Sequence, residues 1–528
     1  MGLNRGVALA ALAALAVARA EAAPTPAEAA RFLTQASFGP TTAEISTVAS
    51  QGYQSWLDNQ FSQNASLHRP QLEPPDFAGT ATQAERQEVW WRYAVTAPDQ
   101  LRQRVAFALS ETMVVSDVND QLHSQPLLLA EYYDTLTRDA FANYRTLLQN
   151  VTLAPAMGVY LSMIRNDKPD AKSGRRPDEN YAREIMQLFS IGLWQLNPDG
   201  TPRLGAGGNR IPTYSQQTIG NFARVFTGWG WADASQFYAT GTSYQPMKAF
   251  EDHHDTGAKT LLDGAQVPAG QTAAQDLNSA LDNIFNHPNV GPFIARRLIQ
   301  RLVTSNPSGA YVQRIAAVFN NNGTGVRGDL KAVVSALLLD PEARGAPAGS
   351  AGKLREPLLR LSAVWRAFGA AAANGKYKYD YPERDWGQAA LRAPSVFNFF
   401  QPDFSAAGAV SAAGLYSPEF QIQTESQSVS MVNAFTRFVR NQSACRGTLP
   451  DTDASTIKLD ICAAAARATD PANLLDDLNQ LLLSGRMSAP MRAALLEYLN
   501  SLPAGDGTQR ARDAIFLISA SPEFAVQK

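Results

Sequence analysis

Helical hydrophobic periodicity recurs along most of the chain, and this pattern constrains the fold more than any other feature. Segments 85–97, 127–141 and 290–304 place apolar residues at the three- and four-residue spacing of one helix face. Alternating apolar and polar runs typical of half-buried strands are scarce. The sequence therefore predicts a mainly α protein of stacked helical hairpins, with long ordered loops and at most a small β-hairpin.

Three further segments share one helix start signal. In each, a side chain that can cap the helix is followed by a proline at the first helical position and by an acid that favours the positive end of the helix dipole. The three are Asp340-Pro341-Glu342, Ser417-Pro418-Glu419 and Ser521-Pro522-Glu523. We interpret them as marks of architecture that carry no chemistry.

Length and charge limit the classes of protein to consider. A chain of 528 residues with 45% apolar residues can bury two to three domain-sized cores. We divide it into 21–270, which holds the polar segment 178–192 and a long ordered loop over 231–269, and 271–528. The net charge of -2 gives no overall attraction to a polyanion, so no nucleic-acid partner is expected.

Residues 1–20 have the pattern of a secretory signal peptide. They contain Arg5, an apolar run over 7–17 and the triplet Ala18-Arg19-Ala20, which fits a small-x-small cleavage site. The run is too short for a transmembrane helix, and no Cys follows it for lipid attachment. We expect a periplasmic or secreted protein without a transmembrane segment; the alternative is an uncleaved interfacial anchor.

The two cysteines, Cys445 and Cys462, are the whole thiol content of the chain. In an exported protein, two thiols so close in sequence most simply form one disulfide. Closing a loop of this length stabilises a fold by about 3 kcal/mol in the chain-entropy model. The alternative is a pair of unlinked structural thiols.

The segment 178–192 concentrates polar side chains on one side of a predicted helix. At about 100° per residue, Asn180, Arg183, Glu184 and Gln187 share one stripe, beside an apolar stripe that includes Ile185. An amide, a guanidinium and a carboxylate on one face suit recognition of a polar ligand. The alternative is a purely structural role, in which Arg183 only pairs within its own helix.

A second polar concentration lies in the loop 251–259. His254, Asp255 and Lys259 supply an imidazole, a carboxylate and an ammonium, a set that can move a proton or hold a cation. The alternative is a solvated polar turn. Trp229, just after a predicted Gly228 helix stop, is either a ligand platform or part of the core. Likewise, the aromatic cluster 395–400 is either exposed or packed under a loop.

Familiar catalytic signatures are missing from the sequence. It contains five histidines, and it has no Gly-x-Ser-x-Gly elbow, phosphate-binding Gly-Lys-Ser/Thr loop, Cys-x-x-Cys or His-Glu-x-x-His. A metal cage of several histidines is therefore not expected. The sequence identifies neither a cofactor nor a metal.

Several motifs in order resemble the bacterial family known as domain of unknown function 1800, or DUF1800. They are PDENYARE at 177–184, FTGW at 226–229, HDTGAKT at 254–260, FNHPNVGPFI at 285–294, PSVFNF at 394–399 and SPEF at 521–524. The resemblance implies a large exported protein without an established activity, commonly encoded beside a sulfatase-like exported protein. Asn180, Arg183, Glu184, Trp229, His254, Asp255 and Lys259 match the family pattern.

The chain departs from this family at two places. Many relatives carry Trp-His-x-His-Phe where this chain has Leu109-Ser110-Glu111-Thr112-Met113, and a His where it has Phe189. A mechanism that needs those imidazoles would not operate here.

Three functional hypotheses follow. The first is a binding or assembly protein that works with the sulfatase-like protein on a polysaccharide or other envelope or extracellular polymer. The second is a metal-assisted hydrolase or lyase, with Glu184 as general base, His254 and Asp255 on a cation or proton, and Arg183 and Lys259 on an anionic substrate. The third is a structural protein of the cell surface with a flat exterior.

Overall fold

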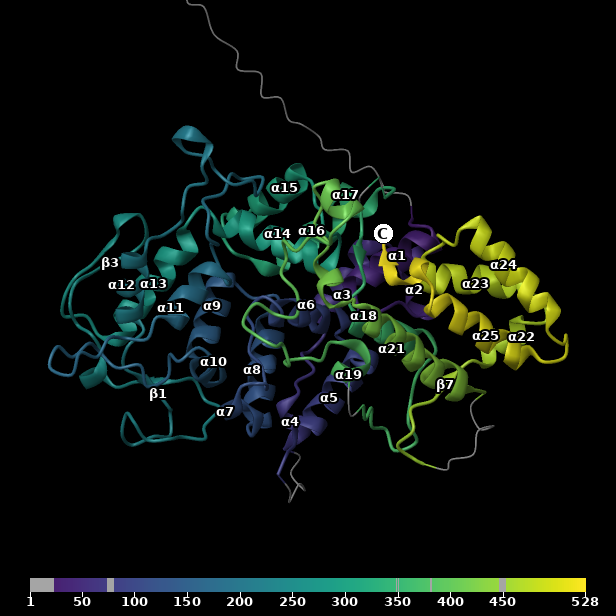
Figure 1. The fold of residues 1–528 in the computed structure, drawn as a ribbon, viewed down its shortest axis with the longest axis horizontal. Helices are drawn as coiled ribbons and strands as arrows, with labels where there is room; N and C mark the ends of the chain where they lie inside the picture. The colour runs from purple at the N-terminus through teal and green to yellow at the C-terminus, as the bar shows by residue number, and fades with distance from the viewer. Residues whose placement is uncertain (1–22, 74–79, 348, 350, 380–381, 446–452) are drawn as a thin grey trace, which may run out of the picture.

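The computed structural model describes residues 23–73, 80–347, 349, 351–379, 382–445 and 453–528. The predicted signal peptide, 1–20, lies outside them. Helices dominate the described residues and strands occur only as two-residue pairs, so the predicted mainly α fold is confirmed (Figure 1).

The first half of the chain contains the following helices: α1 Pro26–Ala36, α2 Thr42–Gln51, α3 Tyr53–Ser62, α4 Arg69–Leu72, α5 Gln83–Thr96, α6 Gln100–Ser110, α7 Asp120–His123, α8 Pro126–Asp139, α9 Tyr144–Leu153, α10 Pro155–Tyr160, α11 Asn180–Gln187, η1 Ala206–Gly208, α12 Gln216–Val225, η2 Glu251–His253 and η3 Leu262–Gly264.

The second half continues with α13 Ala273–Asn286, α14 Val290–Leu302, α15 Gly309–Asn320, α16 Leu330–Leu339, α17 Pro341–Arg344, α18 Pro357–Ala367, α19 Pro382–Trp386, α20 Ala409–Ala412, η4 Pro418–Ile422, α21 Glu425–Phe435, η5 Thr436–Asn441, α22 Cys462–Arg467, α23 Pro471–Leu483, α24 Ala489–Ser501, α25 Gly507–Ser519 and α26 Pro522–Ala525.

Side-chain caps fix where many of these helices begin. Thr25, Thr41, Thr82 and Thr272 each accept a hydrogen bond from the third helical amide, whose own side chain reciprocates. Such capping boxes satisfy amides that have no partner within the helix. Of the three shared start signals, Asp340 and Ser521 cap α17 and α26, whereas Ser417 makes no cap and precedes the 3-10 turn η4.

One large apolar core takes residues from helices between α1 and α26, and a small second cluster contains Leu72, Ala81, Val89 and Ala130. Near the middle of the large core, Trp91 of α5 and Trp365 of α18 are fully buried, with ring centroids 5.0 Å apart. Helices α11 to α13 lie at one end of the molecule and α22 to α25 at the other (Figure 1). The division of the chain near residue 270 stays a prediction.

The strands fasten loops to the helical body. The predicted long loop 231–269 is ordered and contributes to two antiparallel pairs, β1 Trp229–Gly230 with β2 Lys248–Ala249, and β3 Lys259–Thr260 with β4 Gln266–Val267. The strand β5 Lys353–Leu354 pairs antiparallel with β8 Val526–Gln527, which lies at the end of the chain.

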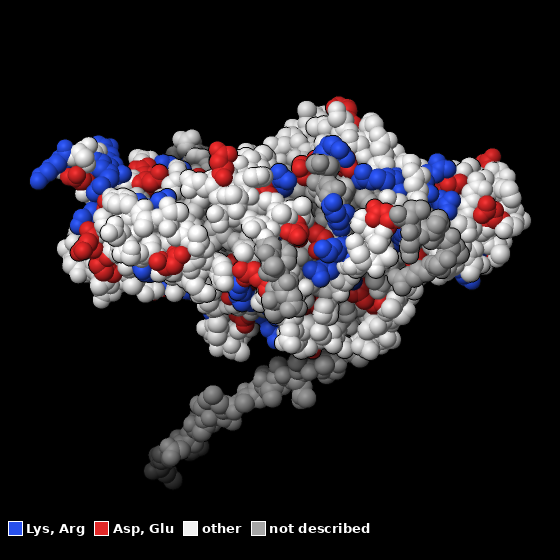
Figure 2. All heavy atoms as spheres, turned by 90° about the horizontal axis from the view of Figure 1, so that it is seen from below, with Lys and Arg blue, Asp and Glu red and all other residues white. Residues whose placement is uncertain are grey.

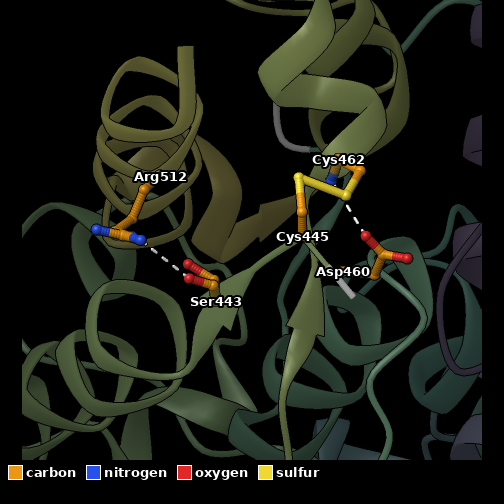
Figure 3. Close-up of a disulfide and its surroundings, with 5 residues drawn as sticks. All are labelled: Ser443, Cys445, Asp460, Cys462 and Arg512. Atoms are coloured by element: carbon orange, nitrogen blue, oxygen red, sulfur yellow. Dashed lines mark hydrogen bonds between the residues drawn. A yellow bond between two sulfur atoms is a disulfide. The ribbon is translucent and has the colours of Figure 1, made fainter. Parts of the chain in front are cut away.

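The predicted disulfide is present between Cys445 and Cys462 (Figure 3). It adjoins the parallel pair of β6 Ser443–Ala444 and β7 Leu459–Asp460, and the Cys462 amide donates to the Asp460 carboxylate at 3.1 Å. Arg512 of α25 donates to the Ser443 carbonyl at 3.1 Å. A disulfide is consistent with an extracytoplasmic protein.

The described residues contain no membrane-spanning helix, and the face in Figure 2 carries charges of both signs. Every helix in the described residues is too short or too polar to reach across a bilayer. On the face shown in Figure 2, acidic and basic side chains are interspersed. This mixture agrees with the small net charge of -2.

Candidate functional site

The polar stripe of α11 divides between solvent and interior. Tyr181 and Ile185 are buried in the core, and Asn180 is exposed. Arg183 donates to Glu179 at 3.1 Å one turn earlier, and both side chains are more than one-third exposed. Such a surface pair contributes only a few tenths of a kcal/mol.

Glu184 is the buried member of this stripe. Its side chain is buried, and one carboxylate oxygen, Oε2, has no hydrogen-bond partner. Burial raises the pKa of Glu184 to about 6, against the opposing field of Arg183. The nearby Tyr214 hydroxyl also lacks a partner, and burial together with Glu184 raises the pKa of that phenol to about 12.

We expect Glu184→Gln to stabilise the fold at alkaline pH. A raised carboxyl pKa means that the folded state disfavours ionisation, so wild-type stability falls as pH rises toward 6 and the penalty is complete above it. The gain is at most about 2 kcal/mol at pH 8 and vanishes near pH 4. Denaturant midpoints at the two pH values measure it, with the more exposed Glu179→Gln as control. An equal effect at both pH values would contradict the buried carboxyl.

The loop residues His254, Asp255 and Lys259 form one buried polar network. The His254 Nε2 lies 3.0 Å from Asp276 Oδ2, and Nδ1 lies 3.0 Å from the Thr227 carbonyl. The Lys259 ammonium lies 2.6 Å from the same Asp276 oxygen. Because both ring nitrogens of His254 have partners, the imidazole contributes to internal structure in this conformation.

Asp255 completes that network. Arg224 of α12 donates to both of its carboxylate oxygens, at 2.7 and 3.0 Å. Although burial opposes ionisation, Arg224 and the Gly257 amide hold the pKa of Asp255 below its usual value. Gly228 allows the close packing here, since a Cβ at its φ of +83° would lie 2.9 Å from the His254 amide. Trp229 beside it is buried, and its indole nitrogen has no partner.

The neighbouring His253 has the freer imidazole. Its Nδ1 lies 3.1 Å from buried Asp167, and its ring stacks on Phe237 at 4.1 Å. Together with the aromatic side chains of Phe237 and Tyr238, it lines a surface cavity of about 390 Å³. His253 thus borders a cavity, whereas His254 lies in the buried polar network; the predicted catalytic role of His254 stays a prediction.

A larger cavity, of about 450 Å³, lies beyond the C-terminal end of α11. It is bordered by Gln187 of the polar stripe, by α14, by the end of α6 and by segments 193–210 and 396–416. We call it the arginine cavity, because four arginines line it: Arg210, Arg296, Arg297 and Arg301.

Each arginine of the cavity lies over an aromatic ring, which orients its guanidinium group. The distances from guanidinium carbon to ring centroid are 6.0 Å for Arg210 over Trp194, 5.5 Å for Arg296 over Tyr416, 4.9 Å for Arg297 over Phe293 and 4.5 Å for Arg301 over Phe400.

The cavity carries more positive than negative charge, since two carboxyl groups, those of Glu111 and Asp403, line it beside the four arginines. Arg301 lies 3.5 Å from Glu111, but within the described chain no carboxylate oxygen lies within 4.0 Å of Arg210, Arg296 or Arg297. Burial, followed by the fields of Arg296 and Arg301, lowers the pKa of Arg297 to about 10. Guanidinium groups that converge in this way disfavour one another's ionisation. Such clusters are typical of anion-binding sites.

Exposed apolar side chains border the same cavity. Leu193, Trp194 and Phe397 are 46%, 36% and 44% exposed, although Phe400 of the same aromatic cluster is buried. Asn398 adopts a positive φ of 67°, and its buried amide nitrogen has no partner. Strained, unsatisfied polar groups beside a cavity are common at functional sites.

The residues singled out from sequence do not all meet at one place. His254, Asp255 and Lys259 contact one another, whereas Arg183 and Glu184 make no hydrogen bond or ion pair with them in the described residues. The arginines were missed. The available signal was the presence of Arg296, Arg297 and Arg301 in the otherwise apolar helix α14.

Together, the fold and the cavity describe a mainly α protein with an arginine-lined cavity. The chain belongs to the DUF1800 family, described as a protein of unknown function, whose family model matches residues 31–526. No curated protein and no solved structure matches the chain. Thr112, one of the positions at which the sequence departs from the expected family histidines, lines the arginine cavity together with Glu111.

Proposed function

We propose that this protein binds an anionic polymer, one that carries sulfate or carboxylate groups on sugar rings, in the arginine cavity. The observation that carries the proposal is the meeting in one cavity of three guanidinium groups, those of Arg210, Arg296 and Arg297, that form no ion pair in the described residues. Guanidinium groups donate paired hydrogen bonds to the oxygens of such anions. The volume of about 450 Å³ is in the range of ligand-binding pockets.

The apolar border supports a ring-bearing ligand over a free inorganic anion. Phe397 and Trp194 are partly exposed aromatic side chains, of which Trp194 also carries Arg210 over its ring, and the C–H faces of sugar rings stack on such side chains. An inorganic anion would leave these side chains without a ligand contact. The cavity is also open to solvent at this border, as binding within a longer polymer requires.

The export and partner expectations belong to the same proposal. An exported protein would meet envelope or extracellular polysaccharides, and the disulfide accords with that compartment. A sulfatase-like partner acts on sulfate esters, so the two proteins would share a ligand. Pull-down from periplasm with this protein as bait tests the partnership, and recovery of neither a sulfatase-like protein nor a polymer would count against it.

Equilibrium binding to matched polymers tests the proposal itself. We expect the purified protein to bind dextran sulfate or oligogalacturonate and to leave neutral dextran of the same length unbound. The two charged arms distinguish sulfate from carboxylate recognition. Equal binding of all three polymers, or of none, would contradict an anion-specific cavity.

A metal-assisted hydrolase or lyase that uses Glu184, His254 and Asp255 is the second candidate. One observation favours it: a pKa of about 6 suits Glu184 to act as a general base near neutral pH. The mechanism requires His254 to leave Asp276, because both ring nitrogens are already bonded. Metal analysis of wild type, Glu184→Gln and His254→Ala tests it, and a content near zero in all three would remove the cation mechanism.

A further inference from the structure

The floor of the arginine cavity contains a carboxyl group tied to a second, deeper carboxyl group. Glu111, at the end of α6, lines the cavity and is buried. The amide nitrogen of Gln388 lies 3.0 Å from Glu111 Oε1 and 2.8 Å from Glu356 Oε2. Gln388 and Glu356 are fully buried, so water does not separate these charges. Two carboxyl groups so placed cannot both ionise at neutral pH without a large penalty.

The surroundings decide which of the two keeps the proton. The Lys353 ammonium lies 3.4 Å from Glu356 Oε1. Although burial opposes ionisation, Lys353 and Arg301 hold the pKa of Glu356 at about 2. Burial and the Glu356 charge raise the pKa of Glu111 well above its usual value, against the opposing field of Arg301. The proton therefore resides on Glu111, the member that faces the cavity.

The charged groups around Glu111 come from several elements. Arg104 of α6, Arg301 of α14 and Lys353 of β5 are cations, and Glu356 before α18 and Glu419 of η4 are anions. With Glu111 neutral, these three cations face two carboxylates, and one positive charge is in excess. With Glu111 ionised, its Oε2, 3.5 Å from Arg301 Nη1, becomes the counter-ion of that guanidinium.

We propose that Glu111 makes anion binding in the arginine cavity proton-linked. The protonated carboxyl hydrogen-bonds to Glu356 and leaves Arg301 available to a bound anion. The ionised carboxylate instead occupies Arg301 and repels the ligand. The inference rests on the proposed function, because it needs an anionic ligand. It adds that ionised Glu111 competes with this ligand for Arg301, and that protonation of Glu111 ends the competition.

The pH dependence of binding to a sulfated dextran oligosaccharide tests this coupling. Sulfate esters keep their charge throughout the range from about pH 5 to about pH 9, so the ligand does not titrate. We expect affinity to be constant at low pH and to fall by up to about tenfold per pH unit once Glu111 ionises. A flat profile over the whole range would overturn the inference.

Glu111→Gln is the decisive variant, because its amide resembles a permanently neutral carboxyl group and can still accept from Gln388. We expect it to bind with the low-pH affinity of wild type at every pH. Asp403→Asn, a second cavity carboxylate, is the matched control and should retain the wild-type slope. The same slope in wild type and Glu111→Gln would assign the titration elsewhere.

Two further outcomes separate this inference from the proposed function. If wild type binds no charged polymer at any pH, the proposed function fails. If it binds with no proton uptake, only the inference fails. Calorimetry of wild type in two buffers of different ionisation enthalpy counts that proton directly, and it needs no variant to fold. Uptake of up to one proton at alkaline pH is expected.

Discussion

Replacing Arg297 with glutamine is expected to lower the affinity for a sulfated or carboxylated polymer about ten- to hundredfold, because hydrogen bonds between charged partners contribute about 1.5–3 kcal/mol. Arg297 is the cavity guanidinium whose pKa is lowered to about 10, by burial and then by its two cationic neighbours. It has no carboxylate within 4.0 Å in the described chain. Apart from a hydrogen bond to the Gln300 side chain at 3.3 Å and the more distant charge of Asp403, its positive charge is available to a ligand. Titration calorimetry with wild type and variant measures the loss.

The same variant separates binding from folding. Because Arg297 adds repulsion and no ion pair, Arg297→Gln should leave the midpoint of unfolding unchanged or raised. Arg176→Gln is the matched control, since it removes an exposed guanidinium outside the cavity. Equal loss of affinity in both variants would point to general charge attraction. Loss of folding in Arg297→Gln would indicate a structural role.

Lys353→Met is expected to destabilise the fold by about 3–5 kcal/mol, because it leaves buried carboxylates without their cation. The Lys353 ammonium lies 3.0 Å from Glu419 and 3.4 Å from Glu356, and it donates to the carbonyls of Gln300 and Arg301 at 3.0 and 2.9 Å. All of these groups lie in the interior. The residue thus ties β5 to the end of α14, the start of α18 and η4.

The loss of stability in Lys353→Met should depend on pH. The depressed pKa of Glu356, about 2, means that its ion pair stabilises the fold above pH 4.5 and that this contribution is lost as pH falls toward 2. The difference between Lys353→Met and wild type should therefore shrink in acid. Lys172→Met, at an exposed lysine, should change stability by less than about 0.5 kcal/mol. The double variant Lys353→Met, Glu419→Gln should recover part of the stability lost in Lys353→Met, and no recovery would argue against a charge effect.

Local sequence determined much of the helical architecture. The helix α5 covers most of the predicted segment 85–97, and Thr82 caps it. The helix α14 begins at Val290, where the predicted segment 290–304 begins. Periodicity and capping act over one or two turns, so a single sequence reveals them. Helix ends were less predictable: the predicted helix 178–192 is regular only over Asn180–Gln187.

The candidate site was harder to predict because it is assembled over long sequence distances. Glu111, Gln187, Arg297 and Asn398 line one cavity but come from four separate segments. No local pattern brings them together; the packing of α6, α11 and α14 does. In the loop 251–259, adjacent histidines face opposite environments, buried for His254 and bordering a cavity for His253. Irregular backbone has no period from which to infer this difference.

Chemical protection of arginines by a bound polymer tests the central claim most directly. Wild type is treated with an arginine-selective dicarbonyl reagent, with and without a sulfated dextran oligosaccharide, and the modified peptides are quantified by mass spectrometry. We predict protection of Arg296 and Arg297 in the cavity and unchanged modification of Arg175 and Arg176, which lie outside it. Protection of Arg175 and Arg176, with the cavity arginines still reactive, would contradict the arginine cavity as the binding site.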